Sequence, residues 1–265
     1  MQTAEQTISS AAAKRDPGVS NPSGEPVIVI RHLSKRFGPN IVLNDFSLTV
    51  GKEENVVVMG KSGAGKSVLI KCIIGLLKPD SGELLVFGQD IPQLDHEELD
   101  RVRARVGFLF QSNALYDSMT VRKNLEFPLR RHWFSITQKE VDDMVMEVLE
   151  NVGLADTVDK LPEELSGGMR KRIALARTLI LKPEIILYDE PTTGLDPVTG
   201  KEISLLILEM QKKYHTASII ISHDMHCVKL TADKVSLLMD GKCYAEGTYA
   251  QLERSTDLNI KQFFE

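Results

Sequence analysis

Cysteine, tryptophan and long apolar runs are scarce in this chain of 265 residues, which contains 3 Cys and 1 Trp. Cys72, Cys227 and Cys243 are odd in number and widely spaced, so we expect reduced thiols and no disulfide framework. The absence of an apolar run of about eighteen residues predicts no membrane-spanning helix, and the first residues lack the apolar segment of a secretory signal. His223 and His226 lie beside Cys227, but without a second ligand cluster a metal site is not expected there.

The charge balance is slightly acidic, with 32 Lys and Arg against 37 Asp and Glu and a net charge of −5. A general nucleic-acid binder would be basic, so nucleic acid is excluded as a partner. The length and a hydrophobic content of 42% suit one α/β domain with an inserted piece, or two small domains. Residues 1–26 are rich in small and polar residues without an apolar period, which predicts a disordered tail.

The motif with the most information fits G-x-x-x-x-G-K-[ST] at every fixed position. It follows an apolar, β-branched stretch over 55–59 and precedes a helix expected over 68–77. The glycines free the backbone N–H groups to surround an anion, and the helix start adds its dipole. The lysine can reach the β- and γ-phosphates of ATP and the serine can bind Mg²⁺. The motif consists of Gly60, Lys61, Ser62, Gly63, Ala64, Gly65, Lys66 and Ser67.

A second candidate anion site opens a helix expected over 170–181. We call Leu165–Met169 the LSGGM turn; in it Ser166 can cap the helix, and Gly167 and Gly168 bare the N–H groups beside it. Two phosphate-binding helix starts in one chain leave two interpretations. Either the second is only a cap, or it binds a phosphate held by a second copy.

Polar residues follow two buried strands expected over 184–190 and 218–222. Asp189 and Glu190 point to different faces because strand residues alternate. Asp189 can hold Mg²⁺ through its water shell, and Glu190 can orient or deprotonate the attacking water. The second strand delivers His223 and Asp224 to its carboxyl end, the edge where ligands bind in open α/β sheets.

The first part of the chain predicts strands starting at 27–30 and at 41–50, with a polar turn over 34–38. Phe37 in that turn either stacks on a flat base or folds back onto the core. A strand over 83–88 and a helix over 95–105 precede a buried strand over 106–110, which ends at Gln111.

From 112 to 164 no buried strand pattern occurs, which predicts an all-helical insertion. Thr120 caps a helix expected over 120–127, and Thr137 with Glu140 forms a capping box for one over 137–151 that Gly153 ends. The first part of the insertion is basic, and this basic part is either a solvated face or a docking surface for another subunit. It contains Arg122, Lys123, Arg130, Arg131 and His132, followed by Trp133 and Phe134.

The end of the chain predicts two strands around an Asp240-Gly241 hairpin turn, then short helices over 248–254 and 259–264. The apolar face of the last helix either covers its own domain or holds a partner. It comprises Ile260, Phe263 and Phe264.

Together these motifs resemble the nucleotide-binding subunit of an ATP-binding-cassette (ABC) transporter. The resemblance covers about 27–247 and rests on Gly60–Ser67, Gln111, Leu165–Met169, Ile185–Glu190, Gly194–Asp196 and His223. It implies an α/β P-loop NTPase fold of the ABC type, with a mixed-sheet RecA-like core, an antiparallel β subdomain and a helical subdomain over about 112–182. Residues 248–265 would form a short C-terminal extension.

The resemblance also implies roles. Phe37 would stack on adenine, Gln111 would touch Mg²⁺, Glu190 would be the general base and His223 would contact the γ-phosphate. Two copies would dimerise head-to-tail, so that the LSGGM turn closes on ATP held by the other copy, with Asp196 at the dimer contact. Met169 departs from the glutamine common in the family and cannot donate its hydrogen bond; activity is expected to be kept.

A narrower resemblance, to the ATPases of Mla-type phospholipid transport systems, rests on the insertion: Phe110–Val121, Asn124, Phe127–Leu129 and Met169. It implies a motor at the cytoplasmic face of the inner membrane of Gram-negative bacteria. Its partners would be an integral membrane permease and an MCE-domain lipid-binding protein, with a small STAS-domain protein as a further candidate.

Two other interpretations remain from the sequence. One is a soluble ABC ATPase of the iron–sulfur assembly or cell-division type, or an ABC ATPase for another substrate; the partner-selecting stretch 112–164 discriminates these. The other is a non-enzymatic nucleotide-binding module, which Glu190 and His223 argue against because such a module needs no water-activating pair.

Overall fold

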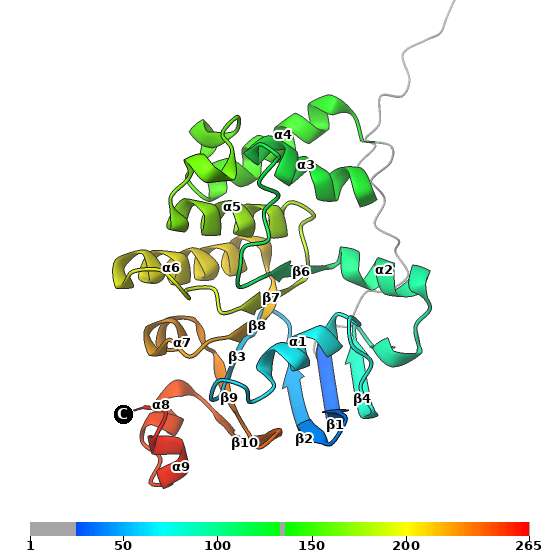
Figure 1. Ribbon diagram of the computed structural model, residues 1–265, viewed down its shortest axis with the longest axis vertical. Helices are drawn as coiled ribbons and strands as arrows, with labels where there is room; N and C mark the ends of the chain where they lie inside the picture. Colours follow the sequence, from blue (N-terminus) through cyan, green and yellow to red (C-terminus); the bar gives the residue numbers. More distant parts are fainter. Residues whose placement is uncertain (1–24, 133–135, 265) are drawn as a thin grey trace, which may run out of the picture.

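A computed structural model describes residues 25–132 and 136–264 of the chain (Figure 1). The described residues form one mixed and one antiparallel sheet with helices between and around them. The tail expected over 1–26 lies outside the described residues except for its last two, and so do Trp133 and Phe134.

The mixed sheet has the strand order β10-β9-β3-β8-β7-β6. Its strands are β3 (Asn55–Met59), β6 (Val106–Leu109), β7 (Ile185–Asp189), β8 (Ala217–Ile221), β9 (Lys234–Met239) and β10 (Lys242–Gly247). The pairs among β9, β3, β8, β7 and β6 are parallel, and β9 pairs with β10 antiparallel. β3 and β8 are buried along their whole length, as expected for continuous apolar runs in a sheet covered on both faces. The residues that follow β3, β6, β7 and β8 therefore meet at one edge.

The antiparallel sheet has the order β2-β1-β4-β5. Its strands are β1 (Ile28–Phe37), β2 (Asn40–Val50), β4 (Ser81–Val86) and β5 (Gln89–Asp90). The polar turn predicted over 34–38 is wrong, because β1 continues to Phe37 and the chain turns at 38–39. Lys35 pairs with Leu43 of β2 and Ser34 with Ser81 of β4, and register shifts along β1 absorb the irregular pattern.

Helix α1 (Lys66–Ile73) packs between the two sheets (Figure 1). Its Leu69 and Ile70 share one hydrophobic core with Phe46 of β2 and Ile219 of β8, so the phosphate-binding loop ahead of the helix is held by both sheets. The other helices of this part are α2 (His96–Ala104), α6 (Pro197–Tyr214) and α7 (Met225–Thr231), with a 3₁₀ turn at Ile91–Gln93.

The insertion is helical, as predicted, and lies at one end of the molecule (Figure 1). It contains α3 (Val121–His132), α4 (Gln138–Asn151) and α5 (Gly167–Leu179), with 3₁₀ turns at Ala155–Thr157 and Pro162–Glu164. The capping box of Thr137 with Glu140 is confirmed, and Gly153 follows α4 at φ +70. Ser166 caps α5, which begins three residues earlier and ends two residues earlier than predicted.

The helix end predicted before Pro128 is wrong, since α3 runs through that residue. A proline inside a helix removes one hydrogen bond and costs about 3 kcal/mol. Val121, Leu125 and Leu129 are fully buried against the core of the insertion. Each such side chain contributes about 1.5–3 kcal/mol when buried, so packing outweighs the local preference for a break.

The C-terminal residues form α8 (Tyr249–Glu253) and α9 (Leu258–Lys261). Ile260 is buried, and the rings of Tyr249 and Phe264 lie 5.3 Å apart between centroids. The apolar face of this end therefore covers its own domain, the first of the two interpretations left by the sequence. Within the described ranges, each helix is too short or too polar to cross a bilayer.

Candidate functional site

The phosphate-binding loop joins β3 to α1, as the sequence predicts. Gly65 takes the N-cap position of α1 at φ +103, in the left-handed region. A Cβ atom there would lie 2.8 Å from Val42 Cγ1 and 2.8 Å from the Val42 carbonyl oxygen of β2. Only glycine fits both this backbone and this space, so the close approach of β2 fixes the loop at a helix start suited to an anion.

Lys66, the first residue of α1, has a largely buried side chain. Its Nζ donates to the carbonyl oxygens of Gly60 at 2.7 Å and Lys61 at 3.1 Å, so the backbone of the loop surrounds the Lys66 ammonium group. Burial lowers the pKa of Lys66, and the carboxylates of Glu190 and Asp189 oppose that shift. An anion in the loop would offer this ammonium a charged acceptor in place of neutral carbonyls.

Asp189 ends β7 beside the start of α1. The hydroxyl of Ser67 donates to Asp189 Oδ1 at 3.4 Å. Burial raises the pKa of Asp189 and the negative charge of Glu190 raises it further, against the hydrogen bond from Ser67 and the nearby Lys71 and Lys66. A half-buried carboxylate beside a hydroxyl is a pair of oxygen donors of the type that Mg²⁺ prefers.

Glu190 follows β7 with φ +51, an unusual backbone for a residue with a side chain. Its backbone N–H donates to the carbonyl of Ile221 at the end of β8. Its Oε2 lies 2.8 Å from His223 Nδ1 and accepts from the Thr193 hydroxyl at 3.2 Å. The Glu190 side chain is 13% exposed and that of His223 is 67% exposed, so the carboxylate is held in place while the histidine reaches solvent.

A cleft of about 590 Å³ lies over the phosphate-binding loop. One wall is the β1–β2 hairpin, the other the β9–β10 turn, whose Gly241 carbonyl accepts from the N–H of Asn44 at 2.8 Å. Phe37 does not line the cleft but pairs with Asn40, which does. The Phe37 side chain is 46% exposed, and Lys35 Nζ lies 5.5 Å from its ring centroid. The ring is not folded into the core. The cleft is lined by Asn40–Val42, Asn44, Lys61–Ala64 and Leu238–Gly241.

Gln111 is exposed two residues after β6, the neighbour of β7 in the sheet. Its position follows from the parallel pairing of β6 with β7, which puts both carboxyl ends at the same edge. The backbone carbonyl of Gln111 accepts from Lys171 Nζ at 3.0 Å. Gln111 therefore follows β6 at the edge of the sheet where Asp189 ends β7.

The LSGGM turn begins α5, and the Ser166 hydroxyl accepts from the N–H of Met169 at 3.2 Å. A Cβ atom on Gly168 would lie 2.6 Å from Thr199 Cγ2 of α6, so any larger residue would force Thr199 to move. Met169 packs against the core of the insertion. Among the described residues, those lining the 590 Å³ cleft include none from this turn, so one chain does not bring its two candidate anion sites together there.

A second hollow of about 290 Å³ lies beside Glu190, between the loop that follows it and the start of α7. Asp196 lies here and caps α6 by accepting from the N–H groups of Val198 and Thr199 at 3.0 Å. The bond from Thr193 to Glu190 was not predicted from the sequence, although a threonine three residues after the candidate base is close enough along the chain to suggest it. Sequence reasoning also missed Lys171, which stands in a run of basic residues that gives no such signal.

The model of the ABC transporter family matches residues 43–193, more than half of the chain, and the chain belongs to that family. It is an ATP-binding subunit that hydrolyses ATP. It is 40% identical over 237 residues, covering 89% of each chain, to the intermembrane phospholipid transport system ATP-binding protein MlaF of Haemophilus influenzae. It is 39% identical over 236 residues, 89% of this chain and 68% of the other, to the probable ribonucleotide transport ATP-binding protein mkl of Mycobacterium leprae.

Among solved structures, the fold matches the dimeric post-hydrolysis state of the ATP-binding cassette MJ0796 bound to ADP and Pi. The TM-score is 0.76 at 30% identity, over 83% of this chain and 98% of that one. The mixed core sheet, the antiparallel β subdomain and the helical insertion of this chain are therefore those of an ABC ATPase.

Proposed function

We propose that two copies of this chain dimerise head-to-tail on ATP, so that the phosphate-binding loop of each faces the LSGGM turn of the other. The observation that carries this proposal is the separation of the two candidate anion sites within one chain. Each has a helix start and a closely packed glycine, Gly65 in the loop and Gly168 in the turn, and the LSGGM turn does not line the cleft over the loop of its own copy. The dimeric post-hydrolysis state of MJ0796, whose fold this chain shares, supports it.

Within this dimer each residue of the candidate site has a distinct role. Lys66 binds the β- and γ-phosphates, Phe37 stacks on the adenine and His223 contacts the γ-phosphate. Glu190 orients the attacking water and accepts its proton, held in place by its bonds to His223 and Thr193. Positioning and charge stabilisation then supply most of the catalysis.

Mg²⁺ fits the donor set of this edge. The Ser67 hydroxyl oxygen lies 3.4 Å from Asp189 Oδ1, and burial raises the pKa of this half-buried carboxylate, which a bound cation would oppose. Ser67, Asp189 and the Gln111 side chain would hold the ion. When bound, Mg²⁺ neutralises charge on the phosphate oxygens.

Asp189→Asn is expected to raise the Tm of the ligand-free protein, on the order of 1–3 °C at pH 7, while abolishing Mg²⁺-dependent turnover. Because the folded state holds the Asp189 proton more tightly than the unfolded chain, this group's contribution to stability falls as pH rises through its raised pKa. The Tm gap between variant and wild type should therefore shrink as the pH is lowered. Asp100→Asn, on the exposed face of α2, is the matched control. A lower Tm for Asp189→Asn would contradict this account.

We also propose that the insertion docks on an integral membrane permease. An aromatic group is exposed on it, with Tyr116 at 43%, Phe127 at 40% and their ring centroids 5.1 Å apart. Asn124 is fully buried and fixes this surface: its side chain accepts from the N–H of Tyr116 and donates to the carbonyls of Tyr116, Met119 and Thr120. Exposed aromatic side chains held by a rigid base suit a protein partner.

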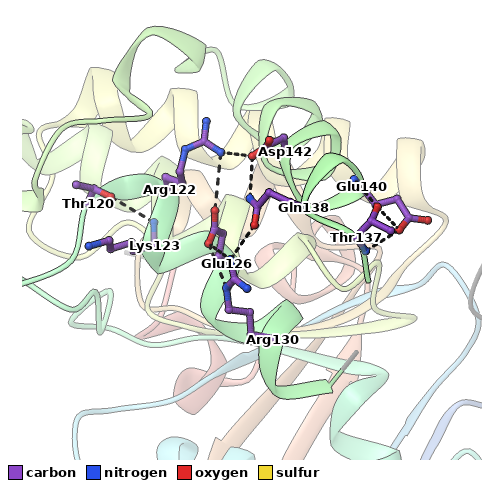
Figure 2. A network of polar contacts seen from close by, with 9 residues as sticks. All are labelled: Thr120, Arg122, Lys123, Glu126, Arg130, Thr137, Gln138, Glu140 and Asp142. Atoms are coloured by element: carbon purple, nitrogen blue, oxygen red, sulfur yellow. Dashed lines mark hydrogen bonds and ion pairs between the residues drawn. The ribbon is translucent and has the colours of Figure 1, made fainter. Parts of the chain in front are cut away.

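The basic side chains of the insertion are less available than their sequence indicates. Arg122 and Arg130 both pair with Glu126 on α3, and Asp142 and Gln138 of α4 complete the network (Figure 2). Glu126 is 8% exposed, so these two arginines join α3 to α4 instead of forming a free cationic face. The docking surface is therefore better described by its aromatic residues than by its charge.

Replacing both exposed aromatics, as Tyr116→Ser with Phe127→Ser, is expected to abolish co-purification with a multi-span membrane protein from detergent-solubilised membranes. Buried aromatic anchors dominate interfaces, and two together are worth about 4 kcal/mol or roughly a thousandfold in affinity. Leu205→Ser, at an exposed apolar position on α6, is the matched control. Undiminished capture by the double variant would place the interface elsewhere, and no membrane protein with the wild type would favour a soluble ABC ATPase.

The transported substrate is proposed to be phospholipid, moved between bacterial membranes, with this chain at the cytoplasmic face of the inner membrane. The support is the relative named for intermembrane phospholipid transport, which is covered along 89% of its length. An MCE-domain protein and a small STAS-domain protein are the proposed further partners. The second candidate is a ribonucleotide, which the name of the relative at 39% identity favours.

Reconstitution of the captured complex into vesicles decides between phospholipid and ribonucleotide as the transported substrate. We expect ATP-dependent movement of labelled phospholipid between vesicles, which a Glu190→Gln complex would not support. Movement of labelled ribonucleotide with no movement of phospholipid would overturn the lipid assignment, while leaving the ATPase and its dimer intact.

A further inference from the structure

Two cations of α5 bind the backbone of the segment that follows β6. Lys171 is 2% exposed, and its Nζ donates to the Gln111 carbonyl at 3.0 Å. Arg177 donates to the carbonyls of Ala114 at 2.7 Å and Asn113 at 2.9 Å. Within the part of the chain that the structure describes, neither cation forms an ion pair with a carboxylate. Both charges are therefore used to hold main-chain carbonyls.

The segment they hold does not have a relaxed backbone. Asn113 and Ala114 both have positive φ, +64 and +50, although neither is glycine. Non-glycine residues keep such conformations only where their surroundings impose them. The bonds from Lys171 and Arg177 to the residues at 111, 113 and 114 supply that constraint, so the course of the segment depends on α5.

The same helix begins at the LSGGM turn. Lys171 lies two residues after Met169, in the first turns of α5, so a rigid element joins the turn to the Gln111 carbonyl. Burial lowers the pKa of Lys171 to about 8, and the carboxylate of Asp189 opposes that shift.

We propose that Lys171 is a positioning residue for ATP hydrolysis, which fixes the main chain at Gln111 to the helix of the LSGGM turn so that both move as one unit. Arg177 extends this connection to the carbonyls of Asn113 and Ala114. The inference rests on the proposed roles of Gln111 at the Mg²⁺ and of the LSGGM turn on a partner's ATP. Lys171 would act through the main chain at Gln111, outside the phosphate-binding loop.

The test uses Lys171→Met, which keeps the length of the side chain and removes its donors. We expect kcat to fall about 10- to 100-fold in the full-length chain, since misplacing a group by about 1 Å has effects of that size. KM for ATP should change less than about threefold, because the loop around Lys66 is untouched. Lys171→Arg should recover most of kcat, since it retains donors to the carbonyl.

The Tm of the Lys171→Met variant distinguishes a positioning role in catalysis from a purely structural role. Lys171→Met removes the desolvation cost of a buried cation together with its bond to the Gln111 carbonyl, two effects of opposite sign, so Tm should change little while kcat falls. A loss of Tm in step with kcat would overturn the proposal. Arg172→Met is the matched control: Arg172 is the next cation on α5 but binds Glu202 of α6 and the Val152 carbonyl, so kcat should stay within about twofold.

A double-mutant cycle with Gln111→Ala tests whether Lys171 acts through Gln111. The alanine keeps the carbonyl that Lys171 binds but removes the side chain, so adding Lys171→Met to it should lower kcat no further. An additive loss, or normal kcat for Lys171→Met alone, would overturn the inference. Full activity of Gln111→Ala alone would instead remove the proposed role of Gln111, and with it the route by which Lys171 acts.

Discussion

The Glu190→Gln variant is expected to bind ATP with near-normal affinity and to hydrolyse it about 10²- to 10⁴-fold more slowly, the range that a general base contributes. The amide keeps the shape of the side chain and an oxygen for the Thr193 hydroxyl, so the site keeps its form. What is lost is the acceptor for the proton of the attacking water. Because hydrolysis is the step that lets the two copies separate, the variant should accumulate as a closed dimer.

Steady-state phosphate release and ATP affinity, measured on the same preparation, check this. Glu184→Gln is the control, because Glu184 precedes the same strand at its other end and pairs with Arg105. Its turnover should stay within about twofold, as expected for an exposed ion pair. Hydrolysis at the wild-type rate by Glu190→Gln would assign the base to another residue.

Lys66→Ala is expected to weaken ATP binding about 10- to 100-fold. A charge-assisted hydrogen bond is worth about 1.5–3 kcal/mol, and Lys66 is the cation that the phosphate-binding loop encloses. Without nucleotide, the same substitution leaves the Gly60 and Lys61 carbonyls without their donor, so some loosening of the loop accompanies the loss of charge.

Equilibrium titration with ATP at fixed Mg²⁺ measures this effect. Lys78→Ala, an exposed lysine beyond the end of α1, controls for a general loss of positive charge and should leave affinity within about twofold. If Lys66→Ala bound ATP as the wild type does, the loop at 60–67 would not be the phosphate site.

Local patterns in the sequence were sufficient where a few neighbouring residues decide the structure. The capping box at Thr137 and the cap at Ser166 depend on contacts within three residues, and the phosphate-binding loop is marked by a motif of eight consecutive residues; all three were predicted. The acidic end of β7 was also predictable, because a buried parallel strand must deliver its next residues to the ligand edge.

Where contacts between distant segments decide the structure, the sequence led to a wrong prediction or to none. β1 reaches Phe37 because β2 and β4 pair with its polar residues, and α3 passes Pro128 because Leu125 and Leu129 are buried beneath it. Lys171 looked like one of several basic residues on a helix. Its role depends on the carbonyl at Gln111, sixty positions away, which no local pattern encodes.

Native mass spectrometry of Glu190→Gln with ATP and Mg²⁺ tests the central claim most directly, because it counts chains and nucleotides in one experiment. Each chain has a mass of 29.5 kDa. The shared-site dimer predicts a species of two chains with two ATP molecules, which reverts to single chains when ADP replaces ATP. A single chain that holds ATP at saturation and never pairs would contradict the account.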